Sequence, residues 1–199
     1  MASWLALGDS YTIGEGVAAH ERWPVVLAQR LRQTGLAIDE PQIIATTGWT
    51  TDELAHAMDE AALAPRHDLV TLLIGVNNQY RGRPINEYRE QFATLLARAV
   101  TLAGDDASRV VVVSIPDWGV THFAGEQGRD RTQIAAELDA FNTVAAEVAR
   151  HAGAAFVDIT GISREHPGLV ADDGLHPSAA QYLLWAGAIE PAVRDALAS

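Results

Sequence analysis

The sequence predicts an α/β fold in which the strands of a parallel sheet alternate with helices along the chain. Short apolar segments alternate with longer segments of helical periodicity, an order typical of a parallel sheet covered by helices. The third and fourth apolar segments consist of Val, Ile and Leu at nearly every position, as expected of strands buried on both faces. The five predicted strands are Trp4–Leu7, Ile43–Ala45, Leu69–Ile74, Val110–Ile115 and Ala155–Val157.

Start signals and apolar spacing predict helices between these strands. Pro24 suits the first turn of a helix, and Thr50 followed by Asp52 and Glu53 suits a capped start with acids in the first turn. The predicted helices are Trp23–Gln33, Thr51–Ala61, Asn86–Leu102, Arg131–His151 and Ser178–Leu197, with a bend or break expected at Pro191. The segment Asp117–Asp130 has little periodicity and is predicted to be a long loop, which in compact domains is often functional.

Length and composition are those of one globular domain spanning residues 1–199. The chain is 48% hydrophobic and 20% charged, which suits a single core of ordinary size. Its net charge of -12 argues against a nucleic-acid partner, because phosphates require a basic face. All 14 basic residues are Arg and there is no Cys, so lysine-based nucleophiles, disulfides and thiolate-bound metals are excluded.

The amino terminus carries no targeting signal of the usual kind. The segment Met1–Leu7 lacks a basic start and is too short for a signal peptide. No apolar segment approaches the ~20 residues that a membrane span needs. We therefore expect a cytoplasmic protein without a membrane span.

Polar segments follow the predicted strands where the strands end. In open α/β sheets, ligands bind outside the carboxyl ends of the strands, so we expect these segments to converge on one edge of the sheet. They are Gly8-Asp9-Ser10, Thr46-Thr47-Gly48-Trp49 and Gly75-Val76-Asn77-Asn78, together with Asp172-Asp173-Gly174-Leu175-His176-Pro177 before the last helix.

These segments contain the groups that an active site with a serine nucleophile needs. A serine hydroxyl needs a base that takes its proton, and His176 can act on Ser10 in this way. Asp173 lies three residues before His176, so a turn can bring its carboxylate to the ring nitrogen that faces away from the serine. The backbone N–H groups of Ser10 and Gly48, with the Asn77 side-chain amide, would supply three donors to an oxyanion.

Taken one at a time, the same residues have plainer interpretations. Ser10 alone could be a turn or helix-capping serine. Asn77 or Asn78 could satisfy loop backbone through its amide. Asp172 could face the imidazole as well as Asp173 could, although the spacing of three residues favours Asp173.

The four segments together resemble a known family. Gly8-Asp9-Ser10-Tyr11, Thr47-Gly48-Trp49, Gly75-Val76-Asn77-Asn78 and Asp173-Gly174-Leu175-His176-Pro177 are similar to the sequence blocks of the SGNH hydrolases, also called the GDSL esterase/lipase family. The family is named for Ser, Gly, Asn and His in separate blocks. Each motif is weak alone, but the four occur in the family's order over nearly the whole chain.

The resemblance implies a flavodoxin-like, three-layer fold with a central five-stranded parallel sheet and helices on both faces. It implies a triad of Ser10, His176 and Asp173, an oxyanion hole of Ser10, Gly48 and Asn77, and no cofactor or metal. Members hydrolyse carboxylic esters, thioesters and acetylated sugars. We expect a small-molecule ester with a short- to medium-chain acyl or acetyl group, because so compact a chain leaves little sequence for a lid.

Two residues depart from the family pattern. Tyr11 stands where Leu is usual after the serine, and Asn78 stands where Asp is usual after Asn77. The second change puts local hydrogen bonding in question rather than the chemistry.

Aromatic side chains follow the same strand ends and are predicted to line a substrate pocket. Ordinary packing of loops onto the sheet is the alternative. The aromatic candidates are Tyr11, Trp49, Tyr80 and Trp118. Arg81 and Arg83 could attract a polar or anionic substrate, but a solvated helix start is the preferred explanation.

Two other kinds of function compete with an esterase. Gly14–Ala19 matches G-x-G-x-x-A, with Asp39 roughly 20 residues further on, as in dinucleotide-binding proteins. The context is wrong, because Gly14 lies well past the end of the first strand and Glu15 would place a negative charge near the pyrophosphate. A domain that binds a ligand without catalysis is the second alternative, and a complete triad argues against it.

Two other hydrolase types fit less well. There is no G-x-S-x-G motif, which α/β-hydrolases carry. A metal-dependent hydrolase could use Asp9, Asp173 and His176, and insensitivity to chelators would exclude it.

Overall fold

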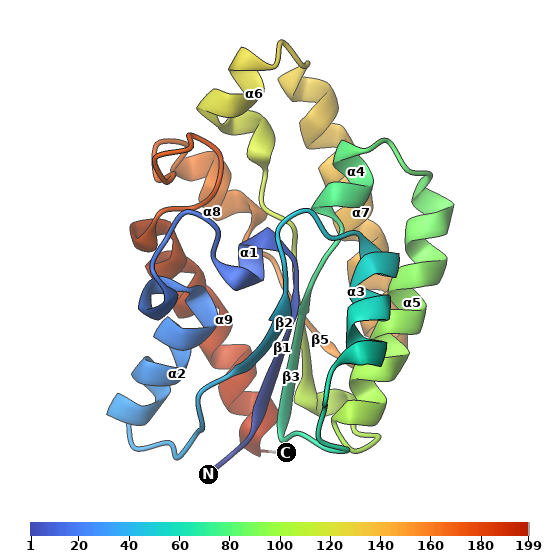
Figure 1. The fold of residues 1–199 in the computed structure, drawn as a ribbon, viewed down its shortest axis with the longest axis vertical. Helices are drawn as coiled ribbons and strands as arrows, with labels where there is room; N and C mark the ends of the chain where they lie inside the picture. Colours follow the sequence, from blue (N-terminus) through green and yellow to red (C-terminus); the bar gives the residue numbers. More distant parts are fainter. Residues whose placement is uncertain (199) are drawn as a thin grey trace.

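Five parallel strands form the central sheet, in the order β2-β1-β3-β4-β5 (Figure 1). The computed structural model describes residues 1–198. The strands are β1 (Trp4–Gly8), β2 (Gln42–Ala45), β3 (Leu69–Leu73), β4 (Val110–Val113) and β5 (Ala155–Val157). In register, Leu5 of β1 pairs with Gln42 on one side and with Val70 on the other.

Helices cover both faces of this sheet. α2 packs against α9 on one face, whereas α3, α5 and α7 lie on the other (Figure 1). These helices are α2 (Trp23–Gln33), α3 (Thr51–Glu60), α5 (Ile85–Leu102), α7 (Arg131–Ala152) and α9 (Ala179–Ala198). The predicted three-layer α/β fold is therefore confirmed, and each predicted strand and helix is present with ends within about three residues of the predicted ones.

The core lies on both sides of the three middle strands. Every residue of β1, β3 and β4 is buried, which explains why these segments lack the alternation of a half-exposed strand. Trp4 of β1 packs on Trp23 of α2 with ring centroids 5.9 Å apart. Trp185 of α9 is also fully buried. Each such side chain contributes a few kcal/mol of hydrophobic stabilisation, about 1.5–3 for an aliphatic or Phe side chain.

Two sequence signals in helices, the cap at Thr50 and the proline at 191, have different outcomes in the structure. The Thr50 N–H donates to Glu53 Oε2 at 2.9 Å, so the predicted capped start of α3 is present. Pro191, where a bend or break was expected, lies inside a single helix. Ile189 and Val193 on either side of it are completely buried, and this packing offsets the ~3 kcal/mol that an interior proline costs.

The segment Asp117–Asp130, predicted as a loop, contains two short helices. The 3₁₀ turn η3 (Trp118–Val120) and the helix α6 (His122–Glu126) lie above the sheet in Figure 1. Each is started by a local cap, because Asp117 accepts from the Gly119 N–H and Thr121 Oγ1 accepts from the Ala124 N–H. One turn is too short to show periodicity, which is why the sequence pattern missed them.

Three other short α-helices and two 3₁₀ turns were also missed for that reason. They are α1 (Ser10–Ile13), α4 (Val76–Tyr80), α8 (Thr160–Glu165), η1 (Ala19–Glu21) and η2 (Ala107–Arg109). α1 begins two residues after the end of β1 and α4 begins three residues after the end of β3, beside the segments that the sequence singles out for chemistry. None of the helices in residues 1–198 combines the length and apolar character that a membrane span requires.

Candidate active site

One cavity of about 220 Å³ opens at the carboxyl edge of the sheet. It is lined by residues from all four of the segments that were expected to converge. Its lining residues are Ser10, Tyr11, Thr47, Gly48, Val76, Asn77, Tyr80, Trp118, Phe123, Leu175 and His176. Four chain segments distant in sequence therefore meet at one place, and the parallel order of β2, β1 and β3 brings three of them there.

Ser10 is the first residue of α1, directly beyond β1. The turn is tight: a Cβ on Gly8 would lie 2.2 Å from Thr12 Oγ1 and 2.7 Å from the Leu73 carbonyl oxygen. Only glycine fits there. The carboxylate of Asp9 caps the helix by accepting the Tyr11 N–H at 3.0 Å, so Gly8 and Asp9 together fix the place of Ser10.

Asp173 and His176 form a local pair on the loop before α9. Asp173 Oδ2 lies 2.6 Å from His176 Nδ1. Asp173 Oδ1 accepts the backbone N–H groups of Leu175 and His176, both at 2.9 Å. Partial burial opposes ionisation of the carboxyl, but these hydrogen bonds outweigh it and hold the pKa of Asp173 below its ordinary value. Of the two candidate carboxylates, Asp173 is the one that contacts the imidazole.

Three residues that line the cavity, Ser10, Gly48 and Asn77, each have an N–H hydrogen that is not engaged. Within residues 1–198, neither the Ser10 N–H nor the Gly48 N–H donates a hydrogen bond to another group. Gly48 has φ +90°, a conformation that favours glycine. Asn77 Nδ2 uses one hydrogen on the Trp49 carbonyl at 2.9 Å, so its second hydrogen is available. A developing negative charge in the cavity would meet unoccupied donors.

Asn78, the departure from the family pattern, lies completely buried behind this edge. Its Oδ1 accepts the Thr51 N–H at 3.1 Å, and its Nδ2 donates to Thr51 Oγ1 at 2.8 Å. The amide thus joins the start of α3 to α4. The doubt about local hydrogen bonding is resolved, since both ends of the amide are paired.

Three of the four predicted aromatic residues line the cavity, and one does not. Tyr11, Tyr80 and Trp118 are part of the wall. Tyr11 lies edge-on to the His176 ring, with centroids 5.9 Å apart. Trp49 is not among the lining residues; it packs on the core beside the cavity, and its contribution is the backbone carbonyl that holds Asn77.

Arg129 covers the outer side of this aromatic wall. Its guanidinium carbon lies 5.1 Å from the centroid of Tyr80 and 5.0 Å from that of Trp118, a cation–π arrangement. The two rings are edge-to-face at 5.4 Å. The segment between α6 and α7 is thereby fastened to the end of α4.

The sequence prediction missed four lining residues. Thr47 and Val76 adjoin predicted site residues, and Leu175 lies between Asp173 and His176, so their positions gave a signal. For Phe123, the sequence offered no signal beyond its place in Asp117–Asp130, the segment predicted to be a long loop. Its N–H donates to the Gly174 carbonyl at 3.1 Å, which joins α6 to the histidine loop.

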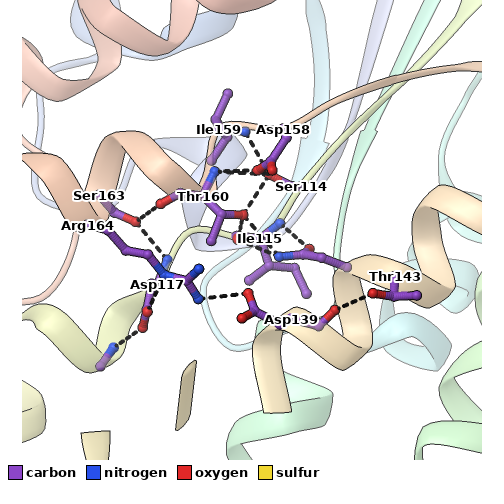
Figure 2. Close-up of polar contacts among 12 residues, drawn as sticks. Ser114, Ile115, Asp117, Asp139, Thr143, Asp158, Ile159, Thr160, Ser163 and Arg164 are labelled. Carbon is purple, nitrogen blue, oxygen red and sulfur yellow. Dashed lines mark hydrogen bonds and ion pairs between the residues drawn. The ribbon is translucent and has the colours of Figure 1, made fainter. Parts of the chain in front are cut away.

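A polar network around the buried Asp117 supports the start of the η3 turn. Figure 2 shows Arg164 donating to Asp117 and Asp139, at 2.8 and 2.7 Å. Ser163 Oγ accepts the Asp117 N–H at 2.8 Å. Asp117 is only 2% exposed, and such a carboxylate requires partners of this kind. The network fixes the residue that precedes Trp118, and with it one wall of the cavity.

The competing motifs occupy other roles in the structure. Gly14 ends α1 with φ +75°, so it does not open a helix as a dinucleotide-binding glycine does. Glu15 accepts the hydroxyl of Thr47. His122 is exposed and pairs with Glu126 at 3.1 Å. In the described part of the chain, no three or more His, Asp or Glu side chains gather as a set that could hold a metal ion.

Comparison with known protein families decides the assignment. The model of the GDSL-like Lipase/Acylhydrolase family matches residues 6–184, most of the chain. The chain belongs to the GDSL-like lipase/acylhydrolase family. This GDSL-family chain is a serine hydrolase of carboxylic esters. No curated protein sequence matches it.

Solved structures share the fold at low sequence identity. A lipase/acylhydrolase from Enterococcus faecalis is 21% identical with TM-score 0.74, and the match covers 98% of this chain and 96% of that one. An acetyl xylan esterase from Geobacillus stearothermophilus is 19% identical with TM-score 0.76, over 96% and 94%. Phospholipase A1 from Streptomyces albidoflavus is 19% identical with TM-score 0.70, over 97% and 98%. At this identity the likeness concerns the fold.

Proposed function

We propose that the chain, as one hydrolase domain, cleaves short- to medium-chain acyl or acetyl esters through an acyl-enzyme on Ser10. The observation that carries the proposal is the His176 ring. One of its nitrogens is held 2.6 Å from Asp173 Oδ2, and the ring itself lines the cavity that contains Ser10. A histidine oriented in this way by a carboxylate is what a serine nucleophile needs as its base.

In the proposed first step, His176 takes the proton of Ser10 Oγ as the oxygen attacks the ester carbonyl. Asp173 stabilises the imidazolium that forms. The negative charge on the carbonyl oxygen is met by the N–H groups of Ser10 and Gly48 and by Asn77 Nδ2. His176 then gives its proton to the leaving alcohol, and a water molecule repeats the sequence on the acyl-enzyme. Loss of one oxyanion donor costs about 3–4 kcal/mol in the transition state.

The cavity supports the proposed acyl size. Apart from Ser10 and His176, its walls are largely apolar and aromatic, and its volume is about 220 Å³. Sites for drug-sized ligands are usually larger, about 300–1,000 Å³. A small acyl group in van der Waals contact with Tyr11, Val76 and Trp118 suits this space.

A carbohydrate acetyl ester is the second candidate. Tyr80 is 42% exposed at the cavity wall and offers an aromatic ring to solvent beside Ser10, a surface on which a sugar ring can lie. The acetyl xylan esterase that shares the fold also supports this alternative. Both candidates use the same chemistry and differ in the alcohol that leaves.

Turnover of an activated short-chain ester tests the chemistry. We expect Ser10→Ala and His176→Ala to lose at least about a thousand-fold in kcat, with Ser10 the site labelled by an organophosphonate. His122→Ala is the matched control, because that exposed histidine pairs with Glu126 outside the cavity; it should retain wild-type turnover. Wild-type activity in Ser10→Ala would refute the proposal, and a screen of acyl lengths and acetylated sugars separates the two candidates.

A further inference from the structure

Arg81 makes a contact that its exposed position does not suggest. Its Nη2 donates to the Gly48 carbonyl at 2.6 Å, while Glu53 Oε1 and Oε2 lie 3.4 Å from Nη1 and Nη2. The guanidinium therefore spans from α3 to the loop after β2. The neighbouring Arg83 pairs with Asp52 instead, at 2.5 Å.

Gly48 needs support from another residue because a glycine backbone is flexible. Glycine has more backbone freedom than any other residue, and Gly48 sits at φ +90° in a loop with its N–H left for the substrate. Its N–H and its carbonyl flank the same Cα. Holding the carbonyl therefore restricts the rotation that would turn the N–H away from the cavity.

The support comes from the residue that directly follows the helix carrying Asn77. Arg81 is the C-cap of α4, and its N–H donates to the Asn77 carbonyl at 3.0 Å, so the two residues lie one helical turn apart. Asn77 Nδ2 donates to the Trp49 carbonyl at 2.9 Å, and Arg81 donates to the carbonyl of the preceding residue, Gly48. Two consecutive peptide groups of the loop are thus tied to α4.

We propose that Arg81 is a positioning residue for the oxyanion hole, which it serves by holding the Gly48 peptide while Glu53 holds the guanidinium. This inference rests on the proposed function. It assigns Arg81 a role in aligning two donors from different loops, Gly48 N–H and Asn77 Nδ2, rather than in attracting an anionic substrate. Two of the donor groups of the guanidinium are engaged by Glu53 and Gly48.

The kinetic test compares Arg81→Gln with Arg83→Gln as the matched control. Both arginines follow α4 and both join it to acidic residues at the start of α3, but only Arg81 contacts Gly48. We expect Arg81→Gln to lower kcat about 10- to 100-fold with little change in KM, short of the 10²–10³-fold loss on removing a donor outright. Arg83→Gln should keep the wild-type kcat. Added guanidinium ion, below denaturing concentrations, should restore part of the kcat of Arg81→Ala.

A second readout does not depend on activity. The Gly48 amide resonance in a ¹⁵N-labelled protein should shift and broaden in Arg81→Gln and, to a smaller extent, in Glu53→Gln, which loosens the guanidinium without deleting it. The Gly48 resonance should keep its wild-type chemical shift in Arg83→Gln. This measurement is made on the resting protein, so it decides the inference even if no ester is turned over.

Failure of the inference and failure of the proposed function are distinguishable. If Arg81→Gln equals Arg83→Gln in kcat and in the Gly48 resonance, and guanidinium ion restores no kcat to Arg81→Ala, Arg81 does not position the loop. If KM alone rises, and rises more for anionic esters, Arg81 binds substrate and the inference is overturned. If the wild-type protein shows no turnover that Ser10→Ala abolishes, it is the proposed function that fails.

Discussion

Asp9, next to the proposed nucleophile Ser10, is a carboxyl group buried without full compensation. It is 0% exposed, its Oδ1 accepts the Tyr11 N–H, and its Oδ2 has no hydrogen-bond partner within residues 1–198. Burial raises its pKa from 3.8 to about 7, although neighbouring backbone N–H groups oppose the shift. Above its folded-state pKa, the protein therefore carries a buried charge that the unfolded chain would solvate.

The sign and size of the effect on stability follow from this shift. Between about pH 4 and pH 7 the folded chain keeps a proton on Asp9 that the unfolded chain has released, so stability falls as pH rises. A shift from 3.8 to about 7 at 1.36 kcal/mol per unit corresponds to about 4 kcal/mol. Asp9→Asn keeps an oxygen to cap α1 but has no titration. Its free energy of unfolding, relative to wild type, should rise by about 4 kcal/mol across this range.

Urea denaturation of both proteins at several pH values from about 4 to 8 measures this difference directly. Other titrating groups are common to both proteins and cancel. Asp173→Asn is the control of opposite sign and needs additional points below pH 4. Hydrogen bonds lower the pKa of Asp173, so its stabilisation is present at neutral pH and is lost only as the pH falls below the ordinary pKa of an aspartate. If the wild-type and Asp9→Asn curves run parallel, Asp9 is not neutralised by burial, and the reasoning is refuted.

Three further substitutions test single contacts. Asn78→Ala leaves the buried Thr51 N–H unpaired and removes the donor to Thr51 Oγ1, and should lower the free energy of unfolding by about 1–3 kcal/mol; urea titration decides. Ser114→Ala orphans the Ile159 N–H, bound to Ser114 Oγ at 2.8 Å (Figure 2), with a similar loss. Arg129→Ala removes the cation from both aromatic rings, about 0.5–1 kcal/mol at an exposed site, and should change KM across acyl lengths more than kcat; an unaltered acyl-length profile would count against a role in the wall.

The larger elements could be predicted because their signals are local and repeated. β3 and β4 are runs of Val, Ile and Leu, and α5 shows an apolar stripe over 18 residues. The missed elements α1, α4 and α6 each have at most five residues, about one turn. At this length, caps and neighbouring loops decide the conformation, and periodicity carries no information.

Much of the candidate site could be predicted because its residues follow the ends of strands, and the strand ends could be predicted. Ser10, Gly48 and Asn77 follow β1, β2 and β3, and the parallel sheet brings all three to one edge. Trp49 was misplaced because position along the chain does not say which way a side chain points. The contact of Phe123 with Gly174 and that of Arg81 with Gly48 were missed, since both are made across the fold with loops 33 or more residues away.

The Asp-x-x-His spacing explains why so short a motif predicted the contact between the Asp173 carboxylate and the His176 ring. Asp173 performs two tasks with one carboxylate: Oδ1 closes the turn by accepting the N–H groups of Leu175 and His176, and Oδ2 meets Nδ1 of the ring. The turn that the carboxylate caps is the turn that brings the imidazole back to it. Orientation of the His176 ring, the proposed base, is thus a local property of four residues, independent of the sheet. The rest of the fold has only to bring this loop close to the end of β1. The edge-on contact of Tyr11 with the His176 ring shows that the loop lies there.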